Sequence, residues 1–307
     1  MDKNKSLLII IAGPTAVGKT NLSIQLAKEY KSSIFSCDSR QFYKELNIGT
    51  AKPSLNELSE VNHFFINNKF INEPYSAGDY EKELIAELKE YFKVNKIAFL
   101  VGGSGMYIDA VCKGLDHLPK NKEVRSKLNL DFKEYGIKHI QEQLYKLDPS
   151  HYNKIDILNP QRIIRALEVS LISGKPYSSF LSNSSKKRNF KTLKFLLHLD
   201  QNQLIENINV RADHMIESGL IEEVKNLSSK KHLNALNTVG YKEVFEYLKG
   251  GINKETAINQ IKINTKKYAK RQMTWFKKDP DYIWVKNNMK ENALNSIKNK
   301  INQFIND

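Results

Sequence analysis

The sequence has 307 residues, enough for a large α/β core together with a smaller inserted or appended domain. Hydrophobic residues make up 40 % of it, which excludes a disordered chain, and the strongly apolar run near the start covers only residues 7–12. That run is far shorter than the roughly 20 residues that span a bilayer, so we expect no membrane partner. The formal net charge of +14 favours an anionic partner, with nucleic acid the leading candidate.

Cysteine usage points to a reducing compartment. The two cysteines, Cys37 and Cys112, are too few and too far apart for a disulfide framework or a zinc site of the usual spacing. The polar start, MDKNKS, leads through a short apolar run directly into a glycine loop, which is not the pattern of a signal peptide. We therefore expect a cytoplasmic protein.

The first third alternates apolar runs with helical patterns. Residues 7–12 predict a buried strand, 19–30 a helix and 33–36 a second strand. Ser76 and Asp79 form a capping pattern for a helix that runs to about residue 92, and a further apolar strand follows at 97–101. Continuous apolar strands joined by helices predict a parallel sheet covered on both faces.

A helical segment interrupts this order. Apolar residues recur at helical spacing over residues 124–135, 137–147 and 161–172, with no strand between them. Strand patterns return at 192–199 and, after long helices, at 282–285. We therefore predict a P-loop NTPase-like, parallel-sheet α/β core over residues 1–117 and 190–307, with an inserted helical domain over 118–189.

A phosphate-binding loop follows the first strand. It matches G-x-x-x-x-G-K-[ST] at every fixed position, and its residues are Gly13, Pro14, Thr15, Ala16, Val17, Gly18, Lys19 and Thr20. Its backbone amides and the start of the next helix can bind phosphate oxygens. Lys19 reaches the terminal phosphates and the Thr20 hydroxyl can hold Mg²⁺. The loop therefore predicts a nucleotide- or diphosphate-binding site, ATP included.

The ends of the next two strands qualify that prediction. The strand at 97–101 ends in Gly102-Gly103-Ser104-Gly105, without the acid that holds Mg²⁺ in motor-type ATPases, so the loop is suited to a diphosphate that leaves as a unit. Asp38 follows the second strand and should face the same site as the loop, where a carboxylate can accept a proton.

Several motifs, in order, resemble the tRNA dimethylallyltransferase (tRNA isopentenyltransferase) family. They are GPTAVGKT, CDSRQFYKELNIGTAKP, LVGGSGMYIDAV, NPQRIIRALEV, NVRADHMIESGLIEEV, TVGYKEV and AKRQMTWF. The resemblance covers nearly the whole chain. With no cysteine after Cys112 to build the C-terminal zinc finger of some members, the bacterial type fits better.

The resemblance implies a Mg²⁺-dependent reaction. A dimethylallyl group passes from dimethylallyl diphosphate to the exocyclic amine of the adenosine 3′-adjacent to the anticodon in tRNA, and diphosphate is released. By the same resemblance, Asp38 is the base, and Lys19, Thr20 and Arg211 stabilise the leaving diphosphate.

The resemblance also implies how the tRNA anticodon stem-loop is bound. The inserted helical domain clamps the stem-loop, and the target base is extruded into the site. The tRNA contacts expected from matching positions are Asp38, Ser39, Arg40, Gln41, Ser104, Arg125, Gln161, Arg162, Ile163, Ile164 and Arg165. Clamping one stem-loop needs no second copy, so we expect a monomer.

Three alternatives stay open from the residues. An adenylate isopentenyltransferase would prenylate free nucleotide, but the helical insertion and the charge favour a large RNA. A small-molecule kinase would also use the loop and Asp38, and would leave the later motifs unexplained. A non-catalytic RNA-binding protein would not need Lys19, Thr20, Asp38 and Arg211 together.

Overall fold

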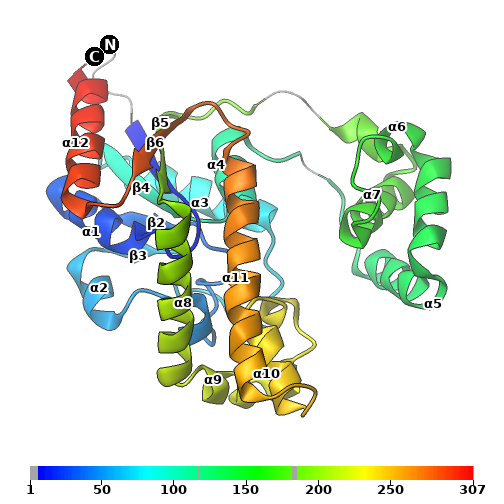
Figure 1. Ribbon diagram of the computed structural model, residues 1–307. Coiled ribbons are helices and arrows are strands. Elements are labelled where there is room, and N and C mark those ends of the chain that lie inside the picture. The colour runs from blue at the N-terminus through cyan, green and yellow to red at the C-terminus, as the bar shows by residue number, and fades with distance from the viewer. Residues whose placement is uncertain (1–5, 117, 182–184, 307) are drawn as a thin grey trace. The chain divides into compact units, whose positions relative to one another are not determined.

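The computed structural model describes residues 6–116, 118–181 and 185–306, and the chain divides into two compact units. The first comprises Met1–Cys112 and Arg188–Asp307, and the second is Lys113–Lys187 (Figure 1). Sequence reasoning put these divisions at 117/118 and 189/190; residue 117 lies outside the described residues. The helical segment is thus inserted, along the chain, into an α/β unit.

Within the described residues, the first unit is built on one six-stranded parallel sheet in the order β3-β2-β4-β1-β5-β6. The strands are β1 (Ser6–Ala12), β2 (Ile34–Ser36), β3 (His63–Phe64), β4 (Ile97–Gly102), β5 (Phe190–His198) and β6 (Tyr282–Lys286). Five of them coincide with predicted strands. The sixth, β3, was not predicted, because two residues among polar neighbours give no periodic signal.

Helices join and cover these strands. They are α1 (Lys19–Glu29), α2 (Leu55–Glu60), α3 (Ala77–Tyr91), α4 (Gly105–Lys113), α8 (Gln201–Glu217), α9 (Leu220–Asn226), α10 (Tyr241–Leu248), α11 (Lys254–Phe276) and α12 (Lys290–Asn306), with short 3-10 turns η1 (Ile48–Thr50), η3 (Ser228–Lys230) and η4 (Asn234–Leu236). The capping box that begins α3 at Ser76 is present as predicted. Long helices α8 and α11 run side by side (Figure 1).

The core of this unit surrounds the central strand β1. Its alternate residues Leu7, Ile9 and Ile11 pack with α1 and α12, and Leu8 and Ile10 are fully buried on the opposite face. Burial on both faces explains why the strand is a continuous apolar run. A parallel sheet directs the carboxyl ends of β1, β2 and β4 toward one edge, and the loops that follow them form the site described below.

The regular elements of the second unit are all helical within its described residues. It contains α5 (Lys122–Leu147), α6 (Pro149–Tyr152), α7 (Pro160–Ser173) and the 3-10 turn η2 (Tyr177–Phe180). The backbone leaves the helical conformation at Gly136, with φ 77°, so α5 is two helical segments, as the separate patterns at 124–135 and 137–147 predicted. Leu128, Ile140, Leu144 and Leu167 belong to its own apolar core.

No helix within the described parts of the chain is both long and apolar enough to cross a bilayer.

Candidate active site

The glycine loop lies between β1 and α1, where the sequence predicted it. Gly18 stands immediately before α1 with φ 90°, a left-handed conformation that favours glycine. A Cβ at Gly18 would lie 2.7 Å from Asn287 Nδ2, and one at Gly13 would lie 2.8 Å from the Leu197 carbonyl oxygen. Both positions therefore require glycine, and the loop leaves its amides at the helix N-terminus available to an anion.

Lys19 is folded back against this loop. Its Nζ donates hydrogen bonds to the carbonyl oxygens of Gly13 (3.0 Å) and Pro14 (2.8 Å). Burial, reinforced by the positive charge of Arg211 and partly opposed by Asp38, lowers the pKa of Lys19 to about 7. The burial of Lys19 and the nearby charge of Arg211 both disfavour the charged ammonium. A bound phosphate would supply a counter-charge and stabilise it.

Arg211 reaches the glycine loop from α8. Its guanidinium Nη2 donates a hydrogen bond to the Thr15 hydroxyl, although 196 residues separate the two in sequence. Arg211, Lys19, Thr20 and Asp38 all line one cavity of about 380 Å³. The structure therefore brings together the four residues to which the sequence assigned catalysis.

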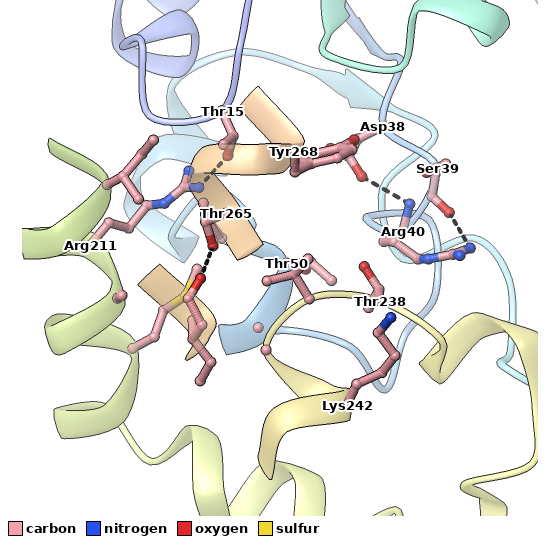
Figure 2. A pocket seen from close by; sticks show the side chains of 18 of the residues that line it. Thr15, Asp38, Ser39, Arg40, Thr50, Arg211, Thr238, Lys242, Thr265 and Tyr268 are labelled. Atoms are coloured by element: carbon pink, nitrogen blue, oxygen red, sulfur yellow. Dashed lines mark hydrogen bonds between the residues drawn. The ribbon is translucent and has the colours of Figure 1, made fainter. Parts of the chain in front are cut away.

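A second cavity, of about 280 Å³ (Figure 2), shares lining residues with the first. Asp38, Arg211 and Thr15 line both cavities. The second one is also lined by Ser39, Arg40, Thr238, Lys242, Tyr268 and Arg271. Asp38 and Arg211 thus lie where the cavity of the glycine loop meets the second cavity.

Asp38 is half-buried and held in place. It follows β2, and its Oδ1 accepts a hydrogen bond of 2.9 Å from the Arg40 backbone N–H. Burial, with the charge of Asp38 nearby, raises the pKa of Tyr268 to about 12, so its phenol stays neutral at pH 7. A fixed carboxylate and a neutral phenol that line the same cavity can accept and donate hydrogen bonds, respectively.

Some predicted tRNA contacts also support the site from within. Ser104 Oγ accepts a hydrogen bond of 3.0 Å from the Ser39 backbone, and Gln41 Oε1 accepts one of 3.2 Å from the Ser36 hydroxyl. Both side chains therefore fix the segment around Asp38. Arg40 lines the second cavity and donates to the Ser39 carbonyl oxygen at 3.2 Å.

Side chains that sequence reasoning missed hold the glycine loop, among them Gln272 and Asn287. Gln272 on α11 accepts from the Thr15 backbone N–H and donates to the Gly103 carbonyl oxygen, each at 2.9 Å. Asn287 Nδ2 donates to the Val17 carbonyl oxygen at 2.7 Å. Gln272 stood in the recognised motif AKRQMTWF, but nothing in its local pattern predicted a partner more than 160 residues away.

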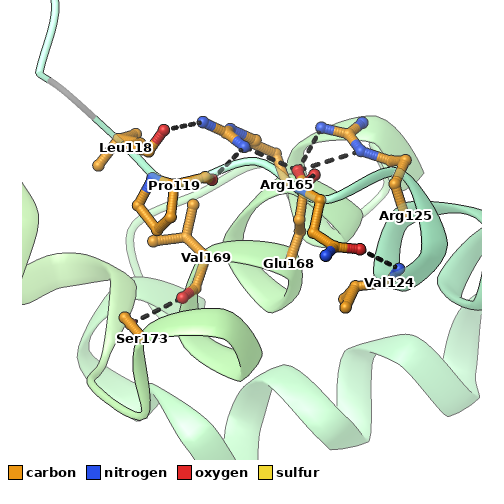
Figure 3. A network of polar contacts seen from close by, with 9 residues as sticks. Leu118, Pro119, Val124, Arg125, Arg165, Glu168, Val169 and Ser173 are labelled. Atoms are coloured by element: carbon orange, nitrogen blue, oxygen red, sulfur yellow. Dashed lines mark hydrogen bonds and ion pairs between the residues drawn. The ribbon is translucent and has the colours of Figure 1, made fainter.

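The helical unit carries a buried carboxylate between two arginines (Figure 3). Arg125 Nη2 and Arg165 Nη1 each lie 2.7 Å from Glu168 Oε2, and Arg165 also donates to the Pro119 carbonyl oxygen at 3.0 Å. Burial alone would raise the pKa of Glu168, but hydrogen bonds from the two arginines hold it below its usual value. The pair of guanidiniums exceeds the single carboxylate by one positive charge.

The other predicted contacts in this unit divide by burial. Gln161 and Arg162, in the first turn of α7, are exposed. Ile163 and Ile164 are fully buried in the apolar core of the unit. These two side chains therefore pack inside the unit and are not exposed on its surface, so a contact of this segment with tRNA through its backbone or its exposed neighbours stays a prediction.

No group of three or more His, Cys, Asp or Glu that could hold a metal ion occurs among the described residues. Thr20 offers one hydroxyl to the cavity lined by Lys19 and Arg211. A single protein oxygen fits Mg²⁺ that is otherwise held by phosphate oxygens and water.

The chain is similar to known proteins over most of its length. A family model described as IPP transferase matches residues 41–279. A tRNA dimethylallyltransferase of Christiangramia forsetii is 49 % identical over 297 residues, covering 96 % of this chain and 98 % of the relative. One of Flavobacterium psychrophilum is 49 % identical over 284 residues, covering 90 % and 92 %.

Solved structures agree with these relatives. The full-length tRNA isopentenylpyrophosphate transferase of Bacillus halodurans is 32 % identical, with a TM-score of 0.73 and coverage of 98 % of this chain and 97 % of that one. A eukaryotic dimethylallyltransferase acting on tRNA is 26 % identical, with a TM-score of 0.80 and coverage of 98 % and 80 %. The chain therefore belongs to the IPP transferase family, whose fold its parallel sheet and glycine loop share.

Proposed function

We propose that this protein transfers a dimethylallyl group from dimethylallyl diphosphate to the exocyclic amine of the adenosine 3′-adjacent to the anticodon in tRNA. The observation that carries the proposal is the position of Asp38 and Arg211 at the meeting of two cavities, one of them lined by the glycine loop. Such a junction suits a reaction between two separately bound substrates. The tRNA dimethylallyltransferases named among the relatives support the choice of substrates.

The bonds change as follows. The adenine N6 nitrogen forms a bond to C1 of the dimethylallyl group, the C1–O bond breaks, and its electron pair leaves with the diphosphate. The proton lost from N6 passes to the Asp38 carboxylate. Lys19 and Arg211 stabilise the charge that develops on the diphosphate, since both line its cavity.

Thr20 would hold Mg²⁺ beside the diphosphate, where the ion adds to the neutralisation of the leaving group. The lowered pKa of Lys19 supports an anionic ligand here, because the ammonium gains a counter-charge when a phosphate binds. We expect removal of divalent cations with EDTA to abolish transfer and added Mg²⁺ to restore it. Undiminished transfer in EDTA would contradict the role of Thr20.

The helical unit is proposed to bind the anticodon stem-loop. Exposed Gln161 and Arg162, together with the Arg125 and Arg165 pair, offer donors and an excess positive charge to the phosphate backbone. Arginine forks match phosphate oxygens in two-point contacts. A single chain supplies all these residues, so we propose that the active form is a monomer.

The test is incubation of the purified protein with radiolabelled dimethylallyl diphosphate, Mg²⁺ and unmodified tRNA, with AMP as acceptor in a parallel reaction. Label in tRNA and none in AMP is the expected result. Label in AMP alone would identify an adenylate isopentenyltransferase instead, and label in neither would refute prenyl transfer.

A further inference from the structure

One carboxylate outside both cavities holds a tight turn by its backbone. Glu223, on α9, accepts hydrogen bonds from three consecutive amides at the start of the turn η1: those of Asn47, the residue before the turn (3.1 Å), and Ile48 (2.8 Å) at Oε2, and that of Gly49 (3.1 Å) at Oε1. The hydroxyl of Tyr241 donates a fourth bond to Oε1 at 2.5 Å. Consecutive amides that converge on one anion form a backbone nest, and bonds to a charged acceptor are about twice as strong as neutral ones.

The Tyr241 ring packs against the backbone of the same turn at Gly49. Tyr241 is fully buried on α10, and a Cβ built on Gly49 would lie only 2.4 Å from its ring. The backbone of the turn therefore lies directly on the ring. No larger residue than glycine fits at position 49 without moving one of the two.

The last residue of the turn and the residue that follows it form a wall shared by the two cavities. Thr50 and Ala51 line both the cavity of the glycine loop and the one that contains Tyr268. Ala51 adopts a left-handed conformation with φ 48°, which costs free energy for a residue other than glycine. The Gln41 amide donates to the carbonyl oxygens of Thr50 and Ala51, each at 3.2 Å.

We infer that Glu223, supported by Tyr241, is a positioning residue for the transfer reaction. Glu223 lines neither cavity, yet its carboxylate fixes the turn that carries Thr50 and Ala51 to the junction of the cavities, which Arg211 also lines. Gln41 connects this turn to the segment that holds Asp38, because its amide donates to the Thr50 carbonyl oxygen and accepts from the Ser36 hydroxyl. This inference rests on the proposed function, because it concerns the alignment of the two substrates.

The direct test is Glu223→Gln, with Glu222→Gln as the matched control. A glutamine has one acceptor oxygen, so it can serve only one side of the nest and turns an N–H₂ group toward the other donors. Glu222 is adjacent, its side chain is 68 % exposed, and its ion-pair partner Lys225 is 3.8 Å away. Turnover should be measured with both substrates saturating, at a temperature where circular dichroism shows each variant fully folded.

We expect kcat of Glu223→Gln to fall by about tenfold or more, with KM for tRNA changed by no more than about threefold, because misalignment at a reaction centre acts on turnover. Glu222→Gln should stay within about twofold of the wild type. A merely structural role for Glu223 would lower the melting temperature and leave the turnover of folded enzyme unchanged. That result, or equal losses in both variants, would overturn the inference.

Two milder changes keep the inference testable if Glu223→Gln does not fold. Tyr241→Phe removes one hydrogen bond and keeps the ring, and Gly49→Ala displaces the turn from the ring; both should lower kcat. Normal turnover in both folded variants would overturn the inference. Absence of transfer by the wild type would instead refute the proposed function itself, so the two failures are distinguishable.

Discussion

Replacing Asp38 by asparagine separates its charge from its hydrogen bond. Asparagine keeps an oxygen that can accept from the Arg40 backbone N–H, which Asp38 Oδ1 does at 2.9 Å, so the segment after β2 should keep its conformation. The change removes the proton acceptor. A positioned acid or base contributes about 10²–10⁴ in rate, which corresponds to roughly 2.7–5.4 kcal/mol of transition-state free energy.

The same substitution should not weaken the binding of dimethylallyl diphosphate. Asp38 opposes the positive charges of Lys19 and Arg211, whose pKa values its carboxylate raises against the effect of burial. Removing this negative charge makes the cavity more favourable to a diphosphate. We therefore expect the KM for dimethylallyl diphosphate to stay the same or fall while kcat drops.

The assay is the initial rate of label transfer to tRNA at several donor concentrations, for the wild type, Asp38→Asn and Asp38→Ala. Alanine also loses the bond to Arg40, so any further loss beyond asparagine measures the cost of disturbing the segment. Activity of Asp38→Asn within about fivefold of the wild type would refute the assignment of Asp38 as proton acceptor.

Three further predictions concern the supports of the site and the helical unit. Gln272→Met keeps the length of the side chain but leaves the Thr15 amide and the Gly103 carbonyl unpaired, so urea unfolding should show a loss of about 1–3 kcal/mol; an unchanged free energy of unfolding would contradict the role of this side chain. Arg162→Gln should weaken tRNA binding and lower the slope of log K against log salt by about 0.7–0.9 if Arg162 contacts one phosphate; an unchanged slope in a filter-binding titration would exclude that contact. Because the folded-state pKa of Glu168 is depressed, its stabilisation is present above the ordinary carboxyl pKa and is lost as pH falls through the lower folded value. The melting temperature should therefore drop on acidification below about pH 4.5, and Glu168→Gln should show a smaller drop than the wild type; equal drops would refute the linkage.

Local patterns in the sequence predicted most of the fold. The glycine loop, the capping box at Ser76 and the break at Gly136 are each determined by residues close together in the chain, and the structure confirms them. Burial on both faces gave β1 its continuous apolar run. Strand β3 has only two residues, His63 and Phe64, and so short a strand is formed by pairing with β2 rather than by its own pattern.

The supports of the site could not be predicted in this way. Gln272 bonds a backbone carbonyl 169 residues away and a backbone amide 257 residues away. Glu223 bonds backbone amides that are 174 to 176 residues away. Every residue has a backbone amide or carbonyl, so a side chain that hydrogen-bonds to the backbone requires no particular residue type at its partner's position. Ile163 and Ile164 lie in a motif whose resemblance predicted RNA contact, and their side chains build the apolar core of the helical unit.

The central claim is transfer to one adenosine next to the anticodon. It is tested most directly with two anticodon stem-loop RNAs that differ only at the nucleotide 3′-adjacent to the anticodon, one with adenosine and one with guanosine. Each is incubated with the purified protein, Mg²⁺ and radiolabelled dimethylallyl diphosphate. The account predicts label in the adenosine RNA and none in the guanosine RNA. Equal labelling of both, or labelling of neither, would contradict it.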